Sequence, residues 1–566
     1  MDIFSIVIIV VLMIVLAIPL GKYTAKIFAG EKTFFDWFAP IENFFFRIAG
    51  INPHEEMNWK QSLKALLMIN LIWFVWAIVA LLTQTYHPFW NPDNIPSMEP
   101  TLAFNTAISF MTNTNLQHYS GETGASYFTQ SLVLTFLQFV SAGTGIAVLA
   151  ALFRALASKS GNNLGNFYSD LVKSCTRILL PLSVIVAIFL MFNGTPSTFH
   201  GAKEVISLQG DTVKVATGPA ASMVAIKQLG TNGGGYFGPN SAHPFENPNF
   251  STNAIETISI LLIPIAMVFA FGYFLRKKKV AWVIFAVMLI GYLALLAPTL
   301  SAEKNGNPTL TNLAIDQSQG NMEGKELRFG STASALWSIS TTVTSNGSAN
   351  SMHDSFMPIS GMCMLLGMQL NSFFGGVGVG FINMFVFIIV AVFISGLMVG
   401  RTPEFLGKKI EAKEVKIAII VALLHPLLIL SGVAISSHIW ATTTNPSDTL
   451  KWLGNPGYHG FSEMLYTVTS ASANNGSEFG GLNGNLPFWN ILDGIIMIIG
   501  RFIPIIGPLA IAGAFAAKKE VPESSGTLRT DSLMFGVVLF SVIVILGALL
   551  FFPALALGPI SEALSL

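Results

Sequence analysis

Long apolar runs constrain this chain more than any other feature of its sequence. A transmembrane helix needs about 20 consecutive apolar residues, and ten runs approach or exceed that length. They cover residues 3–20, 62–82, 127–153, 172–192, 254–275, 280–300, 356–399, 416–438, 488–514 and 532–556. The chain is 52% hydrophobic and only 11% charged, whereas about a quarter of a soluble domain is charged. The sequence therefore predicts an all-α integral membrane protein with ten transmembrane helices.

The distribution of Lys and Arg predicts the orientation of these helices. Most Lys and Arg residues fall in one set of alternate loops and helix ends. The exceptions are Lys203, Lys214, Lys227, Lys304, Lys325, Arg328, Lys451 and Arg501. Basic residues favour the cytoplasmic side, so both termini are expected outside the cell. The first run is expected to be a retained helix rather than a secretory signal, because Asp2 precedes it and Lys22 and Lys26 follow it.

The charge balance, the cysteines and the histidines exclude several other classes of protein. Thirty basic and 30 acidic residues leave no net charge that would favour nucleic acid. Cys175 and Cys363 lie in or beside apolar runs and indicate neither a disulfide framework nor a zinc site. We expect His118, His243 and His353 to brace loops rather than bind metal, because no second ligand follows at helical spacing. No GxxxxGKS or GxxxxGKT phosphate loop is present.

Four loops on the side poor in basic residues share one pattern, in which a semi-apolar stretch ends in Asn, Gly and hydroxyl residues. The segments are SFMTNTNLQ around Asn113, QLGTNGGGYF around Asn232, TTVTSNGSAN around Asn346 and TSASANNGSEF around Asn475. They recur at intervals of roughly 120 residues, which indicates an internal repeat. Four helix–pore-loop–helix units around a central pore, as in potassium channels, with one extra helix at each end, would account for all ten spans.

The expected boundaries follow from this repeat. They are 1–61 for the N-terminal helix and its cytoplasmic loop, 62–153, 154–275, 276–400 and 401–515 for the pore units, and 516–566 for the C-terminal helix.

The four polar segments suit a cation filter. The stretches before them, 101–111, 221–229, 332–343 and 462–469, are too short to span a bilayer. Four helix C-termini aimed at one axis would favour a cation there, and backbone carbonyls can replace its hydration shell. Because the segments hold almost no carboxylates, potassium is favoured over a divalent ion.

The seventh run and one arginine are irregular. As a single helix, residues 356–399 would extend about 66 Å, against a bilayer core of about 30 Å. We expect a break at FFGGVGVG, residues 373–380, either as a kink with close helix packing or as a mobile constriction below the filter. Arg501 is the only basic residue deep inside an apolar run and is a candidate functional residue. A structural ion pair with Asp493 is the alternative.

The segments NTAISFMTNTN, GTNGGGYFGPNSAHPFENP, SMHDSF, FGGVGVG, GRTPEFLGKKI and TSASANNGSEF resemble the KdpA family, the potassium-binding subunits of bacterial Kdp potassium-transporting ATPases. The resemblance covers essentially the whole chain. It implies a filter made of Thr112, Asn113, Thr114, Asn115, Thr231, Asn232, Gly233, Gly234, Ser345, Asn346, Gly347, Asn474, Asn475 and Gly476. It also implies a role in ion affinity for Gln117 and a gate at Gly375, Gly376, Gly378 and Gly380, with Arg501 nearby. The sequence departs from the familiar form of the family at Asn346, where that form has a cysteine. It also departs in the first segment, which lacks glycine.

The resemblance further implies a division of labour between subunits. The chain would bind extracellular potassium and pass it to a P-type ATPase subunit, KdpB. KdpC and the single-helix KdpF would complete the complex in the lipid of a bacterial inner membrane. The chain carries no DKTGT motif and is expected to bind no nucleotide or nucleic acid and to be no enzyme by itself. The alternative is a self-sufficient potassium channel or symporter of the Trk/Ktr type. A sodium-coupled carrier would instead show inverted repeats.

Overall fold

The structure, a computed structural model, describes residues 3–87, 89–159, 161–311, 313, 315–400, 402–442, 452–521 and 529–566. Among them are ten helices long and apolar enough to cross a membrane. They are built from α1 (Ile3–Phe28), α3 (Trp59–Thr83), α6 (Thr135–Ala157), α7 with α8 (Phe167–Ser174 and Leu180–Phe192), α10 (Phe250–Phe274), α11 (Lys278–Asn305), α15 (Val379–Val399), α16 (Ala412–Thr442), α19 (Pro487–Ala517) and α20 (Leu533–Leu555). The prediction of an all-α integral membrane protein with ten spanning helices is confirmed. Asp2, Lys451 and Arg401, the arginine of the GRTPEFLGKKI segment, lie outside the described residues.

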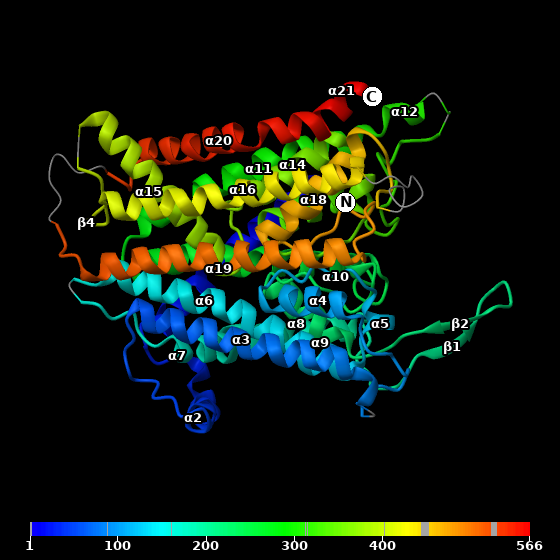
Figure 1. Ribbon diagram of the computed structural model, residues 1–566, viewed down its shortest axis with the longest axis horizontal. Coiled ribbons are helices and arrows are strands. Elements are labelled where there is room, and N and C mark those ends of the chain that lie inside the picture. Colours follow the sequence, from blue (N-terminus) through cyan, green and yellow to red (C-terminus); the bar gives the residue numbers. More distant parts are fainter. Residues whose placement is uncertain are drawn as a thin grey trace.

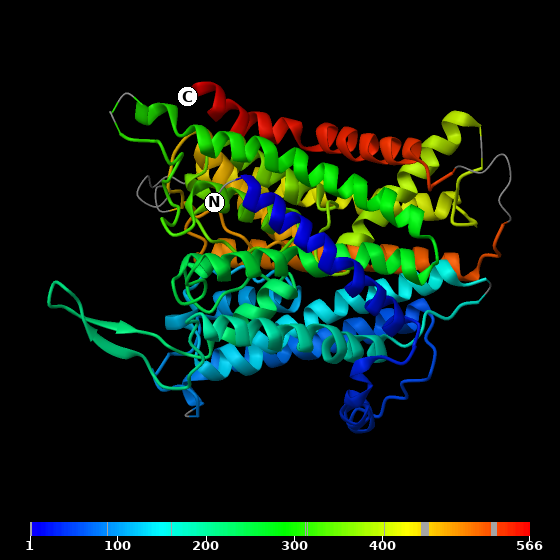
Figure 2. The same cartoon turned by 180° about the vertical axis from the view of Figure 1, so that it is seen from behind.

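The spanning helices run along the long axis of the molecule, and both chain termini lie at one end of it (Figure 1). The same end carries the antiparallel hairpin of β1 (Lys203–Ile206) and β2 (Thr212–Val215). The opposite end carries the short strands β3 (Glu404–Phe405) and β4 (Lys408–Lys409). Figure 2 shows α1 crossing the bundle, where it packs against α10. Two termini at one end agree with an even number of crossings.

Four shorter helices lie within the bundle, at the end that holds the termini (Figure 1). They are α4 (Pro100–Met111), α9 (Ala220–Leu229), α13 (Gly330–Val343) and α18 (Tyr458–Ala473). At the start of α4, Pro100 takes a position that needs no N–H donor, and the Glu99 carboxylate accepts from the Leu102 N–H at 2.8 Å. Each short helix packs against spanning helices, for example α4 against α3 and α19. None of the four is long enough to cross a bilayer.

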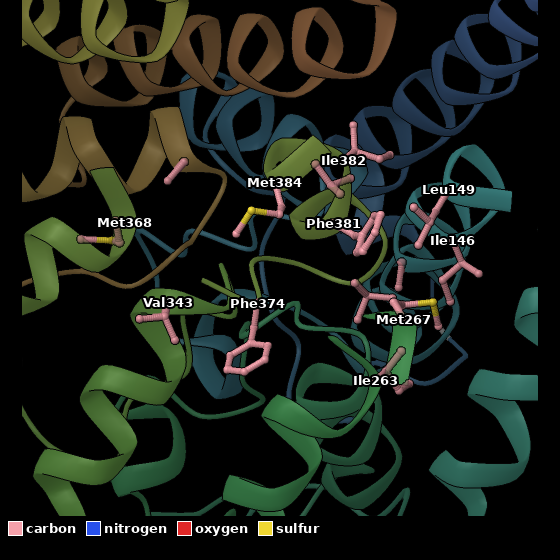
Figure 3. Packing of buried hydrophobic residues seen from close by; sticks show 14 of the residues in the cluster. Ile146, Leu149, Ile263, Met267, Val343, Met368, Phe374, Phe381, Ile382 and Met384 are labelled. Carbon is pink, nitrogen blue, oxygen red and sulfur yellow. The ribbon is translucent and has the colours of Figure 1, made fainter. Parts of the chain in front are cut away.

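The seventh apolar run is broken, as the sequence predicted. Helix α14 (Pro358–Leu370) ends at Asn371, whose φ of 44° is left-handed, and α15 begins at Val379. Figure 3 shows Phe374 of the connecting segment among the apolar side chains of the core. The break is therefore part of the packed interior and not a surface loop.

Shorter elements complete the chain. They are η1 (Phe34–Phe38), α2 (Ala39–Ile48), η2 (Gln84–Tyr86), α5 (Gly121–Gly124), η3 (Thr129–Leu134), η4 (Cys175–Leu179), η5 (Asn240–Ala242), α12 (Pro308–Thr311), η6 (His353–Ser355), η7 (Ala556–Ile560) and α21 (Ser561–Ser565). Neither α2 nor the β1–β2 hairpin is predicted by the apolar runs or the repeat of the sequence.

Candidate functional site: a ring of four polar loops

The loops that follow the four short helices share one backbone pattern, in which a residue of positive φ, one intervening residue and a second residue of positive φ succeed one another. The φ values are 64° and 57° at Asn113 and Asn115, 46° and 84° at Thr231 and Gly233, 50° and 89° at Ser345 and Gly347, and 51° and 94° at Asn474 and Gly476. Non-glycine residues rarely adopt this conformation, and such strain concentrates at functional sites. We call residues 113–115, 231–233, 345–347 and 474–476 the ring loops.

This pattern corrects the alignment of the first loop by one residue. The sequence spacing took Asn113 as the counterpart of Asn232. By backbone conformation Asn113 matches Thr231, and Thr114 matches Asn232. Asn115 stands where the other three loops have glycine, which explains how the first loop can lack one. Thr112 caps α4 instead, and its hydroxyl lies 2.8 Å from that of Thr114.

Close approaches between neighbouring loops close the ring in chain order. A Cβ added to Gly233 would lie 1.9 Å from the carbonyl oxygen of Asn346. A Cβ added to Gly347 would lie 2.2 Å from the carbonyl oxygen of Asn475, and one added to Gly476 would lie 1.8 Å from that of Thr114. The first and second loops meet through the Asn113 amide, which donates to the Thr231 carbonyl at 2.9 Å. Real side chains never approach backbone so closely, so three glycines are required by the contacts of the ring itself.

Asparagine side chains brace the ring from behind. The Asn232 amide donates to the Asn113 Oδ1 at 2.6 Å. The amide of Asn346 donates to the Lys227 carbonyl at 3.0 Å, and that of Asn475 to the Thr341 carbonyl at 2.8 Å. These bonds tie the second loop to the first loop, and the third and fourth loops to the short helices α9 and α13, and they hold the backbone angles that the ring needs.

Two cavities lie on opposite sides of the ring. An outer vestibule of about 500 Å³ is lined by Asn115, Gln117, Gly347 and Gly476. Gln117 links the first and second segments, because its side-chain amide donates to the Gly235 carbonyl at 3.0 Å and accepts from the Gly235 N–H at 2.8 Å. Gln117 thus lies at the mouth of the ring and not in it.

The inner cavity, of about 300 Å³, is bounded by α15, α16, α19 and α20. Ser345 and Asn474 of the ring loops line it together with Asn371, His425 and Arg501. Arg501 is buried and donates to the Ser141 carbonyl at 3.4 Å. Among the described residues no ion pair joins Arg501 to Asp493. The alternative of a structural Arg501–Asp493 pair is therefore not supported.

The segment between α14 and α15 lies directly under the ring. The Val377 N–H donates to the Thr231 hydroxyl at 2.9 Å, and the Gly375 N–H donates to the Val343 carbonyl at 3.0 Å. A Cβ at Gly376 would lie 3.6 Å from both the Thr231 Oγ1 and the Ser345 Cβ. The four gate candidates have different environments: Gly376 faces the ring, Gly375 and Gly380 pack on each other, and Gly378 packs on the backbone of Gly145.

A buried ion pair, which no sequence pattern predicted, lies behind the second loop. The Lys227 ammonium, in α9, contacts the Glu246 carboxylate, and both side chains are completely buried. It also donates to the Asn240 Oδ1 at 2.8 Å and the Ser241 hydroxyl at 2.7 Å. The Lys227 carbonyl meanwhile accepts from the N–H groups of ring residues 232 and 233. The only available signal was a lysine within a stretch expected to enter the membrane.

The three histidines that follow the segments brace loops, as expected. His118 Nδ1 lies 2.7 Å from the Asn490 Oδ1, and His353 Nδ1 lies 2.9 Å from the Tyr466 hydroxyl. Burial lowers the pKa of His118 to about 4 and that of His353 to about 3. His243 stacks on Phe237 with ring centroids 4.0 Å apart. The neutral imidazoles of His118 and His353 therefore serve as hydrogen-bonding struts, and His243 braces its loop by stacking.

Fold and ring together define a multi-pass α-helical membrane protein in which polar loops meet inside the bundle between two cavities. A family model described as potassium-transporting ATPase A subunit, KdpA, matches residues 7–564. The chain is 59% identical to the potassium-transporting ATPase potassium-binding subunit of Flavobacterium psychrophilum, over 100% of this chain and 99% of that protein. It is 57% identical to the subunit of the same name in Bacteroides thetaiotaomicron and 49% identical to that in Geobacillus kaustophilus, over 98% of both chains in each pair. The chain belongs to the KdpA family.

Proposed function

We propose that this chain is the potassium-binding subunit of an ATP-driven potassium transporter and that the ring loops are its selectivity filter. The observation that carries the proposal is the closed ring, in which strained backbone from four loops meets, each loop against the next. Membership of the KdpA family and the names of the relatives support potassium as the ion. The four pore units, with the boundaries given above, would each supply one side of the filter.

The chemistry of the ring suits a monovalent cation. Left-handed residues at alternate positions turn successive carbonyls, and glycine allows the loops to approach closely. The C-termini of α4, α9, α13 and α18 end at the ring loops and add partial negative charge. The ring loops contain no carboxylate, so a divalent ion would find too little charge there.

The path below the ring would turn sideways. Residues 371–378 lie beneath the second and third loops and obstruct the straight route. The inner cavity instead extends between α15, α16, α19 and α20. We infer that potassium leaves through this side toward a P-type ATPase partner, KdpB, with KdpC and KdpF as further subunits. The complex would lie in the bacterial inner membrane with both termini of this chain outside. A self-sufficient channel is not favoured, because the family model spans nearly the whole chain.

The test is potassium-dependent ATP hydrolysis by the complex purified through a tag on this chain. Gly233→Asp would place a side chain against the Asn346 carbonyl and should abolish or weaken stimulation by low potassium. Gly210→Asp is the matched control, because Gly210 also has positive φ, at 92°, but no atom within 4 Å of an added Cβ. If both variants respond to potassium like the wild type, the ring is not the filter. If the chain purifies alone and passes potassium without ATP, the coupled mechanism is wrong.

A further inference from the structure

The loop after α1, which the distribution of Lys and Arg places on the cytoplasmic side, contains helix α2 (Ala39–Ile48), which projects outside the bundle. In Figures 1 and 2, α2 is seen nearly end-on beside the other helices, so its axis runs across the spans. Its exposed apolar side chains are Ile41, Phe44, Phe45 and Ile48, and η1 before it exposes Phe34 and Trp37. So many exposed large apolar groups on a short segment mark an interaction surface.

The rotation of α2 about its own axis is fixed by ion pairs to the bundle. Glu42 accepts from the Arg177 Nε at 2.7 Å and from its Nη2 at 2.6 Å. The Arg177 Nη1 donates to Asp36 in η1 at 2.5 Å. Phe46, one turn after Glu42, is buried against the protein. A bidentate guanidinium–carboxylate contact is geometrically specific, so the opposite faces of α2 point in set directions.

Three faces of α2 then have different chemistry. With about 100° between successive residues of a helix, positions 41, 44, 45 and 48 fall on one face. Glu42 and Phe46 form the face toward the bundle. Asn43 and Arg47, both exposed, form a polar face on the far side. A short helix with adjoining apolar and polar faces is the pattern of a helix that lies in a membrane interface.

Several observations identify the occupant of the apolar face as lipid. Helix α1, which leads into η1, exposes its own apolar side chains along much of its length, as a span in contact with lipid does. Lys22 and Lys26 in the C-terminal part of α1 and Lys32 between α1 and η1 are all exposed and would meet anionic head groups. Aromatic residues such as Trp37 are enriched at this depth of a membrane. We propose that η1 and α2 lie in the head-group region of the membrane leaflet on the side where most Lys and Arg residues fall, with the apolar face of α2 turned into the acyl chains.

The experiment uses the full complex, purified through this chain and reconstituted in vesicles of phosphatidylethanolamine and phosphatidylglycerol. Cys175 and Cys363 are replaced by Ala, and an environment-sensitive fluorophore is attached at Phe45→Cys or at Asn43→Cys. These positions lie on opposite sides of α2, and both side chains are exposed, so neither substitution disturbs the core. Ile48→Cys provides a second probe on the apolar face.

Acyl chains brominated near the head group should quench the label at position 45 about threefold more than the label at position 43. Position 48 should behave like position 45. Aqueous iodide should show the reverse order. Equal quenching of positions 43 and 45 by iodide would mean that the apolar face meets water, and the proposal would be wrong. A label at position 45 quenched by neither reagent would identify a protein subunit as the occupant instead, which also overturns the proposal.

Discussion

The buried pair of Lys227 and Glu246 allows a quantitative test of how the second ring loop is supported. Lys227→Met leaves the Glu246 carboxylate buried without its cation, and breaking a buried pair in this way costs about 3–5 kcal/mol. The neutral double variant Lys227→Met/Glu246→Gln removes both charges. Replacing a whole pair by uncharged groups is often nearly neutral, so we expect the double variant to lie within about 1–2 kcal/mol of the wild type.

The assay is unfolding in mixed micelles with increasing sodium dodecyl sulfate, followed by tryptophan fluorescence. Arg529→Met is the control, because the Arg529–Asp531 pair is 3.4 Å apart and the arginine side chain is 80% exposed. An exposed pair contributes about 0–1 kcal/mol. The Lys227 carbonyl accepts from Gly233 at 3.0 Å and from the Asn346 side chain at 3.0 Å. Potassium affinity should therefore fall in Lys227→Met and recover in the double variant.

The reasoning fails if the double variant is destabilised by the sum of its two single variants. Additive costs would mean that the two side chains do not interact across their contact. It also fails if Lys227→Met destabilises the protein no more than Arg529→Met does, because the Lys227–Glu246 pair would then not be buried away from water, as it is in the structure.

Three further predictions concern the glycines between α14 and α15, the charge cluster around His459, and the inner cavity. Gly378→Ala should destabilise the protein by about 2–4 kcal/mol, since φ is 78° and a Cβ would lie 2.2 Å from the Gly145 oxygen. Gly376→Ala, with 3.6 Å contacts, should cost less than about 1 kcal/mol in the same titration. His459 lies 2.8 Å from Asp354 and 2.7 Å from Glu562, whose carboxylates raise its pKa to about 10 against the opposing effect of burial. The raised pKa of His459 stabilises the folded protein fully at pH values below the unfolded pKa near 6.5, and this stabilisation is lost as the pH rises through 10. Thermal unfolding measured against pH should show this loss of stability, and His459→Gln should abolish the pH dependence. Arg501→Met should raise passive potassium flux into vesicles, because a buried cation no longer opposes potassium in the inner cavity.

The membrane architecture could be predicted from sequence because it depends on local quantities. Apolar length identified the ten spans found among the described residues, and clustered glycines located the break between Leu370 and Val379. The four polar segments stood out by repetition, and the structure brings the residues of the ring loops together, whereas Thr112 caps α4. Gln117 and Arg501 lie beside the ring, at its outer and inner cavities.

What sequence could not give depends on contacts between distant residues. The register of the first loop turns on backbone angles at Asn113 and Asn115, and a count of Asn spacings cannot detect them. Helix α2 was hidden in a loop because its position depends on Arg177, far away in the chain. The partner of Lys227 lies in the loop after the second segment, at no helical spacing. The Glu478 carboxyl, whose pKa burial raises, faces the His118 imidazole at 3.5 Å only once the first and fourth loops have met.

Because the ring is one continuous polypeptide, its four quarters are free to differ. A ring assembled from four identical subunits repeats any substitution four times, so each change alters every position at once. Here Asn115 can occupy the place that glycine holds elsewhere, and only the first quarter changes. If the ring is the proposed filter, its affinity and selectivity can be adjusted one quarter at a time. The ring is also sensitive to the displacement of any one loop, since each loop packs on the next and a displaced loop leaves its neighbour without that contact.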